Sequence, residues 1–554
     1  MSFLPYPGLV PAGGVPSDAA PSDLLHARNL TATLADGRVL YAGLDLRLPA
    51  GPSALVGDNG SGKSTLLRQL AGDRSTEGGR VHRTADLAWL PQVPARWPAR
   101  VIDLLGDGPR LDALRRLLAG DGSAEDVVLV GEDWTLETTW RARLDALGLA
   151  GVGLDGDPAR LSGGQRQHLR LLAIAHSAAP ILLLDEPSTF LDAEASRHWH
   201  DVFARRGGAV LVASHDPAWL HAMPRLFELR AGALYRVDGG LATWRAMRAE
   251  RLRQGEAALQ QARLERTRTQ QAVARERQRL EQRQVRGRRA GRDANQSPLL
   301  LDRLADSAER GQGRRRIALA QRLDAGDQAV RAAFDAFDAP AAPQFVQTAV
   351  ALPPGRQVLT FAQAHPTCAR PVAALDWQAS GPVRIGLTGR NGSGKTTLLR
   401  ALLGQAGLAS GSARALVPAQ TLDQHLDGLP DETGALDWLQ AAIPDETRAT
   451  IATRLALLGL GRDHVERPMR TLSGGERMRV AIAAAAWVGP AAPLLLLDEP
   501  ASHLDPASVD ALVALLRAWP GALLVVSHDA DLLEAIGLDI GLRLDADGLR
   551  LHPM

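Results

Sequence analysis

Cysteine is almost absent from this chain of 554 residues, in which Cys368 is the single one. One cysteine excludes an internal disulfide framework and any zinc site made of several thiolates. We assign Cys368 no role, because a lone cysteine is more often a packing residue than a nucleophile. Such low cysteine usage is typical of a reducing compartment, and we expect a cytoplasmic protein.

Long apolar runs are also scarce. Only residues 480–497 approach the length of a membrane span, with 18 positions free of charge. They contain a glycine and two prolines and run directly into Asp498, so a buried helix followed by a buried parallel strand is the better interpretation. The first residues lack a basic segment and are interrupted by prolines, which argues against a secretory signal. We therefore expect no membrane domain in this chain.

Lysine is the third shortage. Lysine and arginine together number 63, yet the only lysines are Lys63 and Lys395. Arginine serves wherever a general positive charge suffices. A compact ammonium fits among phosphate oxygens where a planar guanidinium does not, so the two lysines indicate two phosphate-binding loops.

The two loops belong to an internal repeat. GDNGSGKS occupies 57–64 and GRNGSGKT occupies 389–396; LSGGQ and LSGGE occupy 161–165 and 472–476; ILLLDEPSTFLD and LLLLDEPASHLD occupy 181–192 and 494–505. The spacing agrees too, since 29 positions separate Lys63 from Gln92 and Lys395 from Gln424. Between the glutamine and the LSGG motif the first copy has 21 extra residues, which predicts an insertion at about 101–140.

Domain boundaries follow from the repeat. We expect a flexible N-terminus over 1–23, a first α/β domain over 24–240 and a second over 346–554, each built around a strand, a glycine loop and a helix. The connecting segment 241–345 differs in composition. From Arg245 to Arg316 it has 20 arginines against 9 acidic residues.

Helix-forming residues dominate this connecting segment. One helix of about 60 Å is expected over 245–285, then a turn around Gly287, Gly291 and Pro298, and a returning helix over 299–337 that is interrupted near 311–313. The whole is a helical hairpin. The arginine excess favours an RNA backbone as partner, and the candidate RNA contacts at the tip are Arg286, Arg288, Arg289 and Arg292. A solvated helical spacer is the alternative.

The glycine motifs predict where a nucleotide binds. In GxxxxGK[ST] loops, backbone N–H groups surround the phosphates, the lysine adds a positive charge, and the last hydroxyl ligates Mg²⁺. The candidate ATP-binding residues of the first copy are Gly57, Asn59, Gly60, Gly62, Lys63, Ser64 and Thr65. Those of the second are Gly389, Asn391, Gly392, Gly394, Lys395, Thr396 and Thr397.

The apolar strands that end in Asp-Glu supply the catalytic candidates. The glutamate after each aspartate would polarise the attacking water, and a histidine 30 positions after the aspartate would contact the γ-phosphate: these are Glu186, His215, Glu499 and His528. The Mg²⁺ candidates are the loop hydroxyls, the aspartates and the glutamines that sense the metal: Ser64, Gln92, Asp185, Thr396, Gln424 and Asp498. Gln420 is a rival to Gln424, and the 29-residue spacing favours Gln424.

The LSGG motifs add a serine and small residues at the expected start of a helix, where free N–H groups and the helix dipole bind anions. A phosphate already held by one glycine loop has no use for a second loop in the same domain. Each LSGG motif is therefore expected to serve the nucleotide of the opposite domain, through Ser162, Gly163, Gly164, Ser473, Gly474 and Gly475.

Together these motifs resemble the ATP-binding cassette superfamily. The resemblance implies an ATPase with ATP and Mg²⁺ as ligands, and a monomer whose two P-loop cassettes pair head to tail. One composite site would join Lys63, Ser64, Gln92, Asp185, Glu186 and His215 to Ser473 and Gly475. The other would join Lys395, Thr396, Gln424, Asp498, Glu499 and His528 to Ser162 and Gly164.

Two cassettes joined by a basic helical segment are similar to the ABC-F subfamily. This implies a cytosolic protein that binds the ribosome, with the hairpin directed at rRNA and P-site tRNA and with an arm of the first cassette also in contact; no DNA specificity is expected. The sequence departs from the family where an aromatic residue should stack on adenine, since Leu34 and His365 lie near those positions. The alternative function is a fused ATPase subunit of a transporter with separate membrane subunits. A DNA-repair role is disfavoured, because the zinc cysteines of such relatives are absent.

Overall fold

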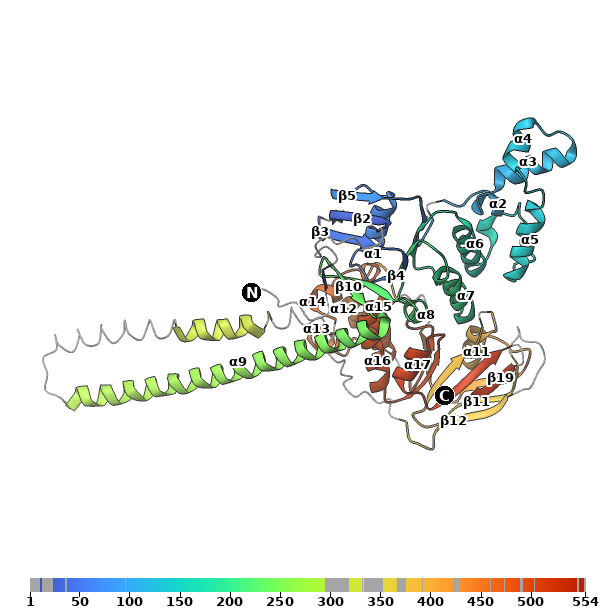
Figure 1. Ribbon diagram of the computed structural model, residues 1–554. Helices are drawn as coiled ribbons and strands as arrows, with labels where there is room; N and C mark the ends of the chain where they lie inside the picture. The colour runs from blue at the N-terminus through green and yellow to red at the C-terminus, as the bar shows by residue number, and fades with distance from the viewer. Residues whose placement is uncertain are drawn as a thin grey trace. The chain divides into compact units, whose positions relative to one another are not determined.

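The computed structural model describes residues 10–11, 23–34, 37–94, 96–293, 318–330, 332, 352–365, 375–390, 392–422, 426, 428–458, 460–472, 474–488, 492–502, 504–545 and 548–552. The chain divides into two compact units (Figure 1). One unit comprises Met1–Thr243 and Pro340–Met554 and holds both halves of the repeat, and the other comprises Trp244–Ala339.

The first cassette is built on a seven-stranded sheet with the order β1-β10-β9-β4-β8-β7-β6. Five of its strands run parallel to one another, and most of their residues are apolar, as is typical of parallel strands in a covered sheet. They are β4 (Gly51–Val56), β6 (Leu87–Leu90), β7 (Ile181–Asp185), β8 (Ala209–Ala213) and β9 (Arg225–Arg230). At one edge β9 is followed by the antiparallel strands β10 (Ala233–Asp238) and β1 (Val10–Pro11); the other residues of 1–22 lie outside the described residues.

A second, antiparallel sheet completes this cassette. It has the order β3-β2-β5 and consists of β2 (Leu25–Thr33), β3 (Val39–Leu48) and β5 (Gly78–Arg83). Helix α1 (Lys63–Ala71) follows β4, and its leucines pack with both sheets in one core. Because β4, β7 and β8 are parallel neighbours, their carboxyl ends lie at the same sheet edge. This edge receives the glycine loop, Asp185-Glu186 and His215.

The second cassette repeats this architecture. Its parallel strands are β13 (Arg384–Thr388), β15 (Ala419–Leu422), β16 (Leu494–Asp498), β17 (Ala522–Val526) and β18 (Ile540–Asp545), and β19 (Gly548–His552) closes the edge in the order β15-β16-β17-β13-β18-β19. The antiparallel sheet contains β11 (Gln357–His365), β12 (Leu375–Ser380) and β14 (Ser410–Ala415). Helix α11 (Lys395–Leu402) follows β13. The predicted fold class of two α/β P-loop domains is confirmed.

Helices complete each cassette. In the first they are α2 (Val101–Leu104), α3 (Gly108–Ala119), α4 (Ala124–Val130), α5 (Leu136–Ala146), α6 (Gly163–His176), α7 (Ala193–Ala204) and α8 (Pro217–Leu220), with a 3-10 turn at Pro158–Arg160. In the second they are α12 (Ala435–Ala442), α13 (Arg448–Leu457), α14 (Arg462–Val465), α15 (Gly474–Trp487), α16 (Pro506–Ala518) and α17 (Ala530–Ile536), with a 3-10 turn at Met469–Thr471. Helices α3 and α4 lie within the interval where the sequence places the extra residues.

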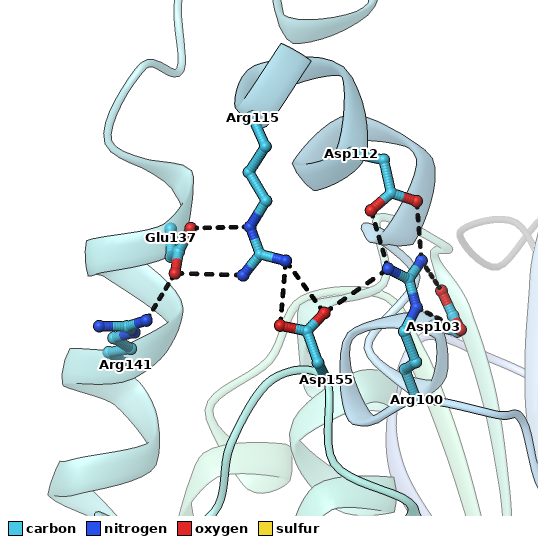
Figure 2. Close-up of polar contacts among 7 residues, drawn as sticks. All are labelled: Arg100, Asp103, Asp112, Arg115, Glu137, Arg141 and Asp155. Atoms are coloured by element: carbon cyan, nitrogen blue, oxygen red, sulfur yellow. Dashed lines mark hydrogen bonds and ion pairs between the residues drawn. The ribbon is translucent and has the colours of Figure 1, made fainter. Parts of the chain in front are cut away.

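The α3 helix is tied to its surroundings by an ion-pair network (Figure 2). Arg115 of α3 donates to Glu137 of α5, with an Nε–Oε2 distance of 3.1 Å, and to Asp155, with an Nη1–Oδ2 distance of 2.9 Å. Asp112 accepts a hydrogen bond from Arg100 at 2.8 Å. Asp155 lies only a few residues before the LSGG motif. The network therefore links α3, within the predicted insertion, to the segment that leads into α6.

The uncharged stretch 480–497 forms the end of α15 and most of β16, and nearly all of its described residues are buried. The interpretation as a buried helix and a buried strand is therefore confirmed. Among the helices that the structure describes, none is long and apolar enough to cross a membrane.

Helix α9 (Gly240–Asp293) has 54 residues, and all but its first four belong to the second unit (Figure 1). At 1.5 Å per residue its length is about 80 Å. The predicted end at 285 and the turn at Gly287 and Gly291 are wrong, because the helix continues through both glycines. An isolated glycine costs a helix only about 1 kcal/mol, and helix-forming residues flank both.

Part of the returning helix is described, over 318–330. It contacts α9 through an ion pair in which Arg266 Nε lies 2.5 Å from Asp327 Oδ1. Pro298 and residues 299–317, 331 and 333–337 lie outside the described residues, and so does the predicted interruption near 311–313.

Candidate active sites

The first glycine loop wraps around Lys63 at the start of α1. The ammonium of Lys63 donates to the carbonyl oxygens of Gly57 at 2.7 Å and Asp58 at 3.1 Å. Gly62 has φ 105°, and a Cβ on Gly57 would lie 2.4 Å from the carbonyl oxygen of Leu229, so glycine is required at both positions. Burial lowers the pKa of Lys63 although nearby carboxylates oppose this. The backbone N–H groups of such a glycine loop, together with the Lys63 ammonium, can bind an anion.

The second loop has the same construction. The ammonium of Lys395 donates to the carbonyl oxygens of Gly389 at 2.7 Å and Arg390 at 3.0 Å, and lies 3.0 Å from His528 Nε2. Burial lowers the pKa of His528 to about 4, and the positive charge of Lys395 acts in the same direction. The imidazole is therefore neutral at pH 7. Asn391 lies outside the described residues.

The predicted Mg²⁺ residues come together in pairs. Thr396 Oγ1 donates to Asp498 Oδ2 at 2.7 Å, and Ser64 and Asp185 form the corresponding hydrogen bond. A hydroxyl and a carboxylate fit Mg²⁺, which takes one or two protein ligands and completes its octahedron with phosphate and water. The described residues contain no cluster of three or more acidic, histidine or cysteine side chains that could hold a metal ion.

The two candidate catalytic glutamates share an uncommon backbone conformation. Glu186 has φ 46° and Glu499 has φ 49°. Burial raises the pKa of Glu186 to about 8 and that of Glu499 to about 7, although the nearby lysine charges oppose it. His215 Nε2 lies 3.6 Å from Glu186 Oε1, and His528 Nε2 lies 3.5 Å from Glu499 Oε1. Each glutamate is thus paired with the predicted histidine of its own cassette.

The glutamine positions are less fully described. Gln92 follows β6 and its side chain is exposed. Its carbonyl oxygen accepts a hydrogen bond from Arg170 of α6 at 3.3 Å, which ties this segment to the helix that begins at the LSGG motif. Gln420 lies within β15, paired with Leu495 of β16. Gln424 lies outside the described residues, so its choice over Gln420 stays a prediction.

The LSGG motifs begin helices, as predicted. Ser162 caps α6 in a capping box: its hydroxyl accepts the N–H of Gln165 at 3.2 Å, and the Gln165 side chain accepts the N–H of Ser162 at 3.0 Å. Gly163 and Gly164 form the first turn. In the second cassette α15 begins at Gly474, while Ser473 lies outside the described residues.

Residues of the opposite cassette reach both glycine loops. The N–H of Asn59 donates to Asp505 Oδ2 at 2.7 Å, and Arg390 Nε lies 3.3 Å from Glu194 Oε2. Sequence reasoning did not single out Asp505 or Glu194. One feature of the sequence could have indicated Asp505: it ends the DEPASHLD motif, at the position that Asp192 occupies in the first copy.

A cavity of about 850 Å³ is lined by residues of both cassettes. They include the catalytic candidates and the first LSGG motif: Gly163, Gly164, Glu186, His215, Glu499 and His528. The two halves of the repeat therefore contact each other and line one cavity within the same chain.

One aromatic residue, Tyr41, lies beside the first glycine loop. Tyr41 packs beside Gly62, but it is buried and its hydroxyl donates to Gln69 Oε1 at 2.9 Å. Tyr41 is therefore a core residue, and the residue that contacts adenine stays a prediction.

The family model described as ABC transporter matches residues 41–189 and 373–502, which together make up half of the chain. The chain belongs to the ATP-binding cassette family. Its tandem cassettes and the relatives that follow make it an ABC-F protein and an ATPase.

Three relatives are similar along most of this ABC-F chain. The tylosin resistance ATP-binding protein TlrC of Streptomyces fradiae is 28% identical over 92% of this chain and 95% of its own. The energy-dependent translational throttle protein EttA of Escherichia coli K12 is 27% identical over 89% of this chain and 87% of its own. The probable ATP-binding protein YheS of the same strain is 27% identical over 89% and 74%.

Solved structures share the fold. An RNase-L inhibitor has a TM-score of 0.55 and 17% identity, over 95% of this chain and 90% of that one. An archaeal ribosome recycling factor, solved in complex with a ribosomal stalk protein, has a TM-score of 0.53 and 19% identity, over 94% and 89%. At this level of identity the likeness concerns the arrangement of tandem cassettes alone.

Proposed function

We propose that this ATPase binds the ribosome in the cytoplasm and acts on translation, as a translation factor or in ribosome protection. The observation that carries the proposal is the combination of paired cassettes with a long arginine-rich helix. The similarity to a translational throttle protein and to a tylosin resistance protein, each along about nine-tenths of this chain, supports it.

In this proposal ATP binds at both glycine loops. The loop hydroxyl and the aspartate of each cassette would hold Mg²⁺, which would supply positive charge to the phosphates. Glu186 and Glu499 polarise the attacking water, and His215 and His528 contact the γ-phosphate. The LSGG motif of the opposite cassette donates N–H groups to the same nucleotide. Each site is then complete only when the cassettes close.

The helix α9 starts two residues after the last strand of the first cassette, at Gly240. ATP-driven movement of that cassette would therefore act on the base of the helix. The proposed partners are rRNA and P-site tRNA. The segment 245–316 has 11 more arginines than acidic residues, and phosphate contacts supply affinity without reading sequence. Arg286 is exposed on α9, and the side chains of Arg288, Arg289 and Arg292 lie outside the described residues.

Co-sedimentation tests this function. Glu186→Gln with Glu499→Gln should trap the ATP-bound state, and the trapped protein should pellet with ribosomes and weaken steeply as salt is raised. Pelleting with membranes alone would instead support the transporter ATPase.

Charge reversal in the same assay tests the role of the helix tip. Replacing Arg286, Arg288 and Arg289 with Glu should abolish ribosome binding and leave basal ATPase activity intact. A matched reversal of three exposed arginines nearer the base, Arg253, Arg263 and Arg268, serves as the control and should weaken binding less. Equal binding by the tip variant and the unchanged protein would reduce the helix to a spacer.

A further inference from the structure

A buried arginine of α6 holds the segment that follows β6. Arg170 is 8% exposed, and it donates to the carbonyl oxygens of Gln92, at 3.3 Å, and Pro91. It also donates to the side-chain oxygen of Gln167 at 2.9 Å. Burial lowers the pKa of Arg170 to about 10, although the negative charge of Asp185 opposes this, so the guanidinium is charged at pH 7. Hydrogen bonds from a charged group are about twice as strong as neutral ones, and the Gln92 segment is therefore firmly attached to α6.

Gln167 adds a second bond between α6 and the nucleotide site at Lys63. Its Nε2 donates to the carbonyl oxygen of Pro187 at 2.7 Å, and Pro187 directly follows Glu186. Gln92 and Glu186 are the predicted metal-sensing and water-polarising residues of that site. One turn of α6 is thus bonded to both of the segments that carry them.

The start of α6 lies at the cavity that both cassettes line. Gly163 and Gly164 form the first turn of the helix, and the same cavity is lined by Glu499 and His528 of the second cassette. Arg170 follows Gly163 by seven positions, which is about 10 Å along a helix. A regular helix of this length is a rigid element that can carry a displacement from one end to the other.

The second cassette lacks both of these side chains. Counted from the serine of each LSGG motif, Gln167 corresponds to Met478 and Arg170 to Ala481, both in α15. Both residues of α15 are buried, and neither can donate a hydrogen bond to a carbonyl oxygen. The same helix therefore forms without these bonds in α15, and they have another purpose in α6 than the fold.

We propose that Arg170 is a positioning residue that couples the two ATP sites, because it attaches the Gln92 segment of the Lys63 site to the helix whose first turn completes the Lys395 site. The proposal rests on the assignment of ATP to these two sites. Filling of the Lys63 site shifts Gln92, and Arg170 transmits the shift through α6 to the LSGG motif beside the other nucleotide. Coupling between two sites commonly changes an affinity by about 5- to 150-fold, and we expect an effect of about tenfold.

A double-mutant cycle tests the coupling. All proteins carry Glu186→Gln, so that hydrolysis of ATP is measured at the Lys395 site alone. With Arg170 present, Lys63→Ala should lower kcat/KM at this site by about tenfold. In the Arg170→Ala protein the same change should lower kcat/KM by no more than about twofold, because the link is already broken. An equal effect of Lys63→Ala in both proteins would overturn the proposal, and so would the absence of any effect when Arg170 is present.

Two further variants separate coupling from a loss of folding. Arg206 donates to the carbonyl oxygen of Ala175, at the other end of α6, at 2.5 Å. Arg206→Ala therefore removes a similar bond from the same helix, and it should leave the effect of Lys63→Ala in place. The double change Gln167→Met and Arg170→Ala gives α6 the two residues that α15 has, and should behave like Arg170→Ala alone. If Arg206→Ala also abolishes the effect of Lys63→Ala, the cause is a general weakening of α6 and the proposal is wrong.

An error in the site assignment would give a different result. Glu186→Gln together with Glu499→Gln should abolish hydrolysis, and retained hydrolysis would show that these glutamates are not the catalytic residues. The assay contains no ribosomes, so its outcome does not depend on the proposed role in translation.

Discussion

Glu186 and Glu499 show how the chemistry is held at the level of single residues. Both have positive φ angles that side chains rarely adopt, and such strain costs of order 1–3 kcal/mol. In each case the backbone N–H donates across to the end of the neighbouring strand, to Ala213 at 2.8 Å or Val526 at 2.9 Å. The same strain at equivalent positions of two cassettes indicates that it positions the carboxylate.

The raised pKa values of these two glutamates predict how stability depends on pH. The folded protein retains protons that the unfolded chain releases near pH 4.5, because burial raises the two values to about 8 and about 7. This contribution to stability is present below pH 4.5 and is lost as pH rises through 7 and 8. We expect the Tm of the nucleotide-free protein to fall with pH in this window.

The matched control is the protein with Glu186→Gln and Glu499→Gln, which cannot ionise at these positions. Its Tm should exceed that of the unchanged protein by at least about 2 °C at pH 8.5 and approach it at pH 5.5. Scanning calorimetry at the two pH values measures this. A constant difference between the two proteins at both pH values would show that the glutamates are not the titrating groups.

At the scale of elements, the two LSGG helices are packed differently. A Cβ on Gly475 of α15 would lie 2.1 Å from the hydroxyl oxygen of Ser508 on α16, whereas a Cβ on Gly164 of α6 would lie 3.2 Å from the carbonyl oxygen of Phe190. The second helix start is therefore in tighter contact with the element that follows Asp505.

Alanine substitution distinguishes these two contacts. Gly475→Ala should displace α15 from α16 and reduce ATPase activity by tenfold or more, about 1.4 kcal/mol in the activation barrier, while Gly164→Ala should have a smaller effect. Adding Ser508→Gly to Gly475→Ala should restore most of the activity, since it removes the obstructing hydroxyl. Steady-state assays measure the ATPase activity of each variant, and circular dichroism confirms that each one is folded. Failure of Ser508→Gly to rescue activity would contradict the packing explanation.

Sequence patterns predicted some elements well and others poorly. The uncharged stretch 480–497 predicts a buried helix and a buried strand, and the structure has both. A parallel strand that is buried on both faces needs apolar residues at almost every position. The glycines at 287 and 291 predict a turn, whereas α9 continues through both to Asp293 because helix formers surround them. A glycine in a helix changes the free energy by only about 1 kcal/mol, which neighbouring residues offset.

At the scale of the whole molecule, the repeat predicts two matching domains, and the structure places the motifs of the first at one sheet edge. Equal spacing in two copies carries that information, because parallel strands bring separate motifs together. The cross-cassette contacts of Asp505 and Glu194 were not predicted. They depend on how two folded surfaces meet, and no period or spacing in the chain encodes that.

The account depends on each nucleotide being held by a glycine loop of one cassette and the LSGG motif of the other. A single-cysteine protein tests this directly: Cys368→Ser removes the only native thiol, and Ser162→Cys places one at the first LSGG motif. The probe is an ATP analogue with a thiol-reactive group on its γ-phosphate, and covalent labelling is measured by mass spectrometry. We predict labelling that Lys395→Ala abolishes and Lys63→Ala leaves in place. Labelling that requires Lys63 and ignores Lys395 would contradict the account.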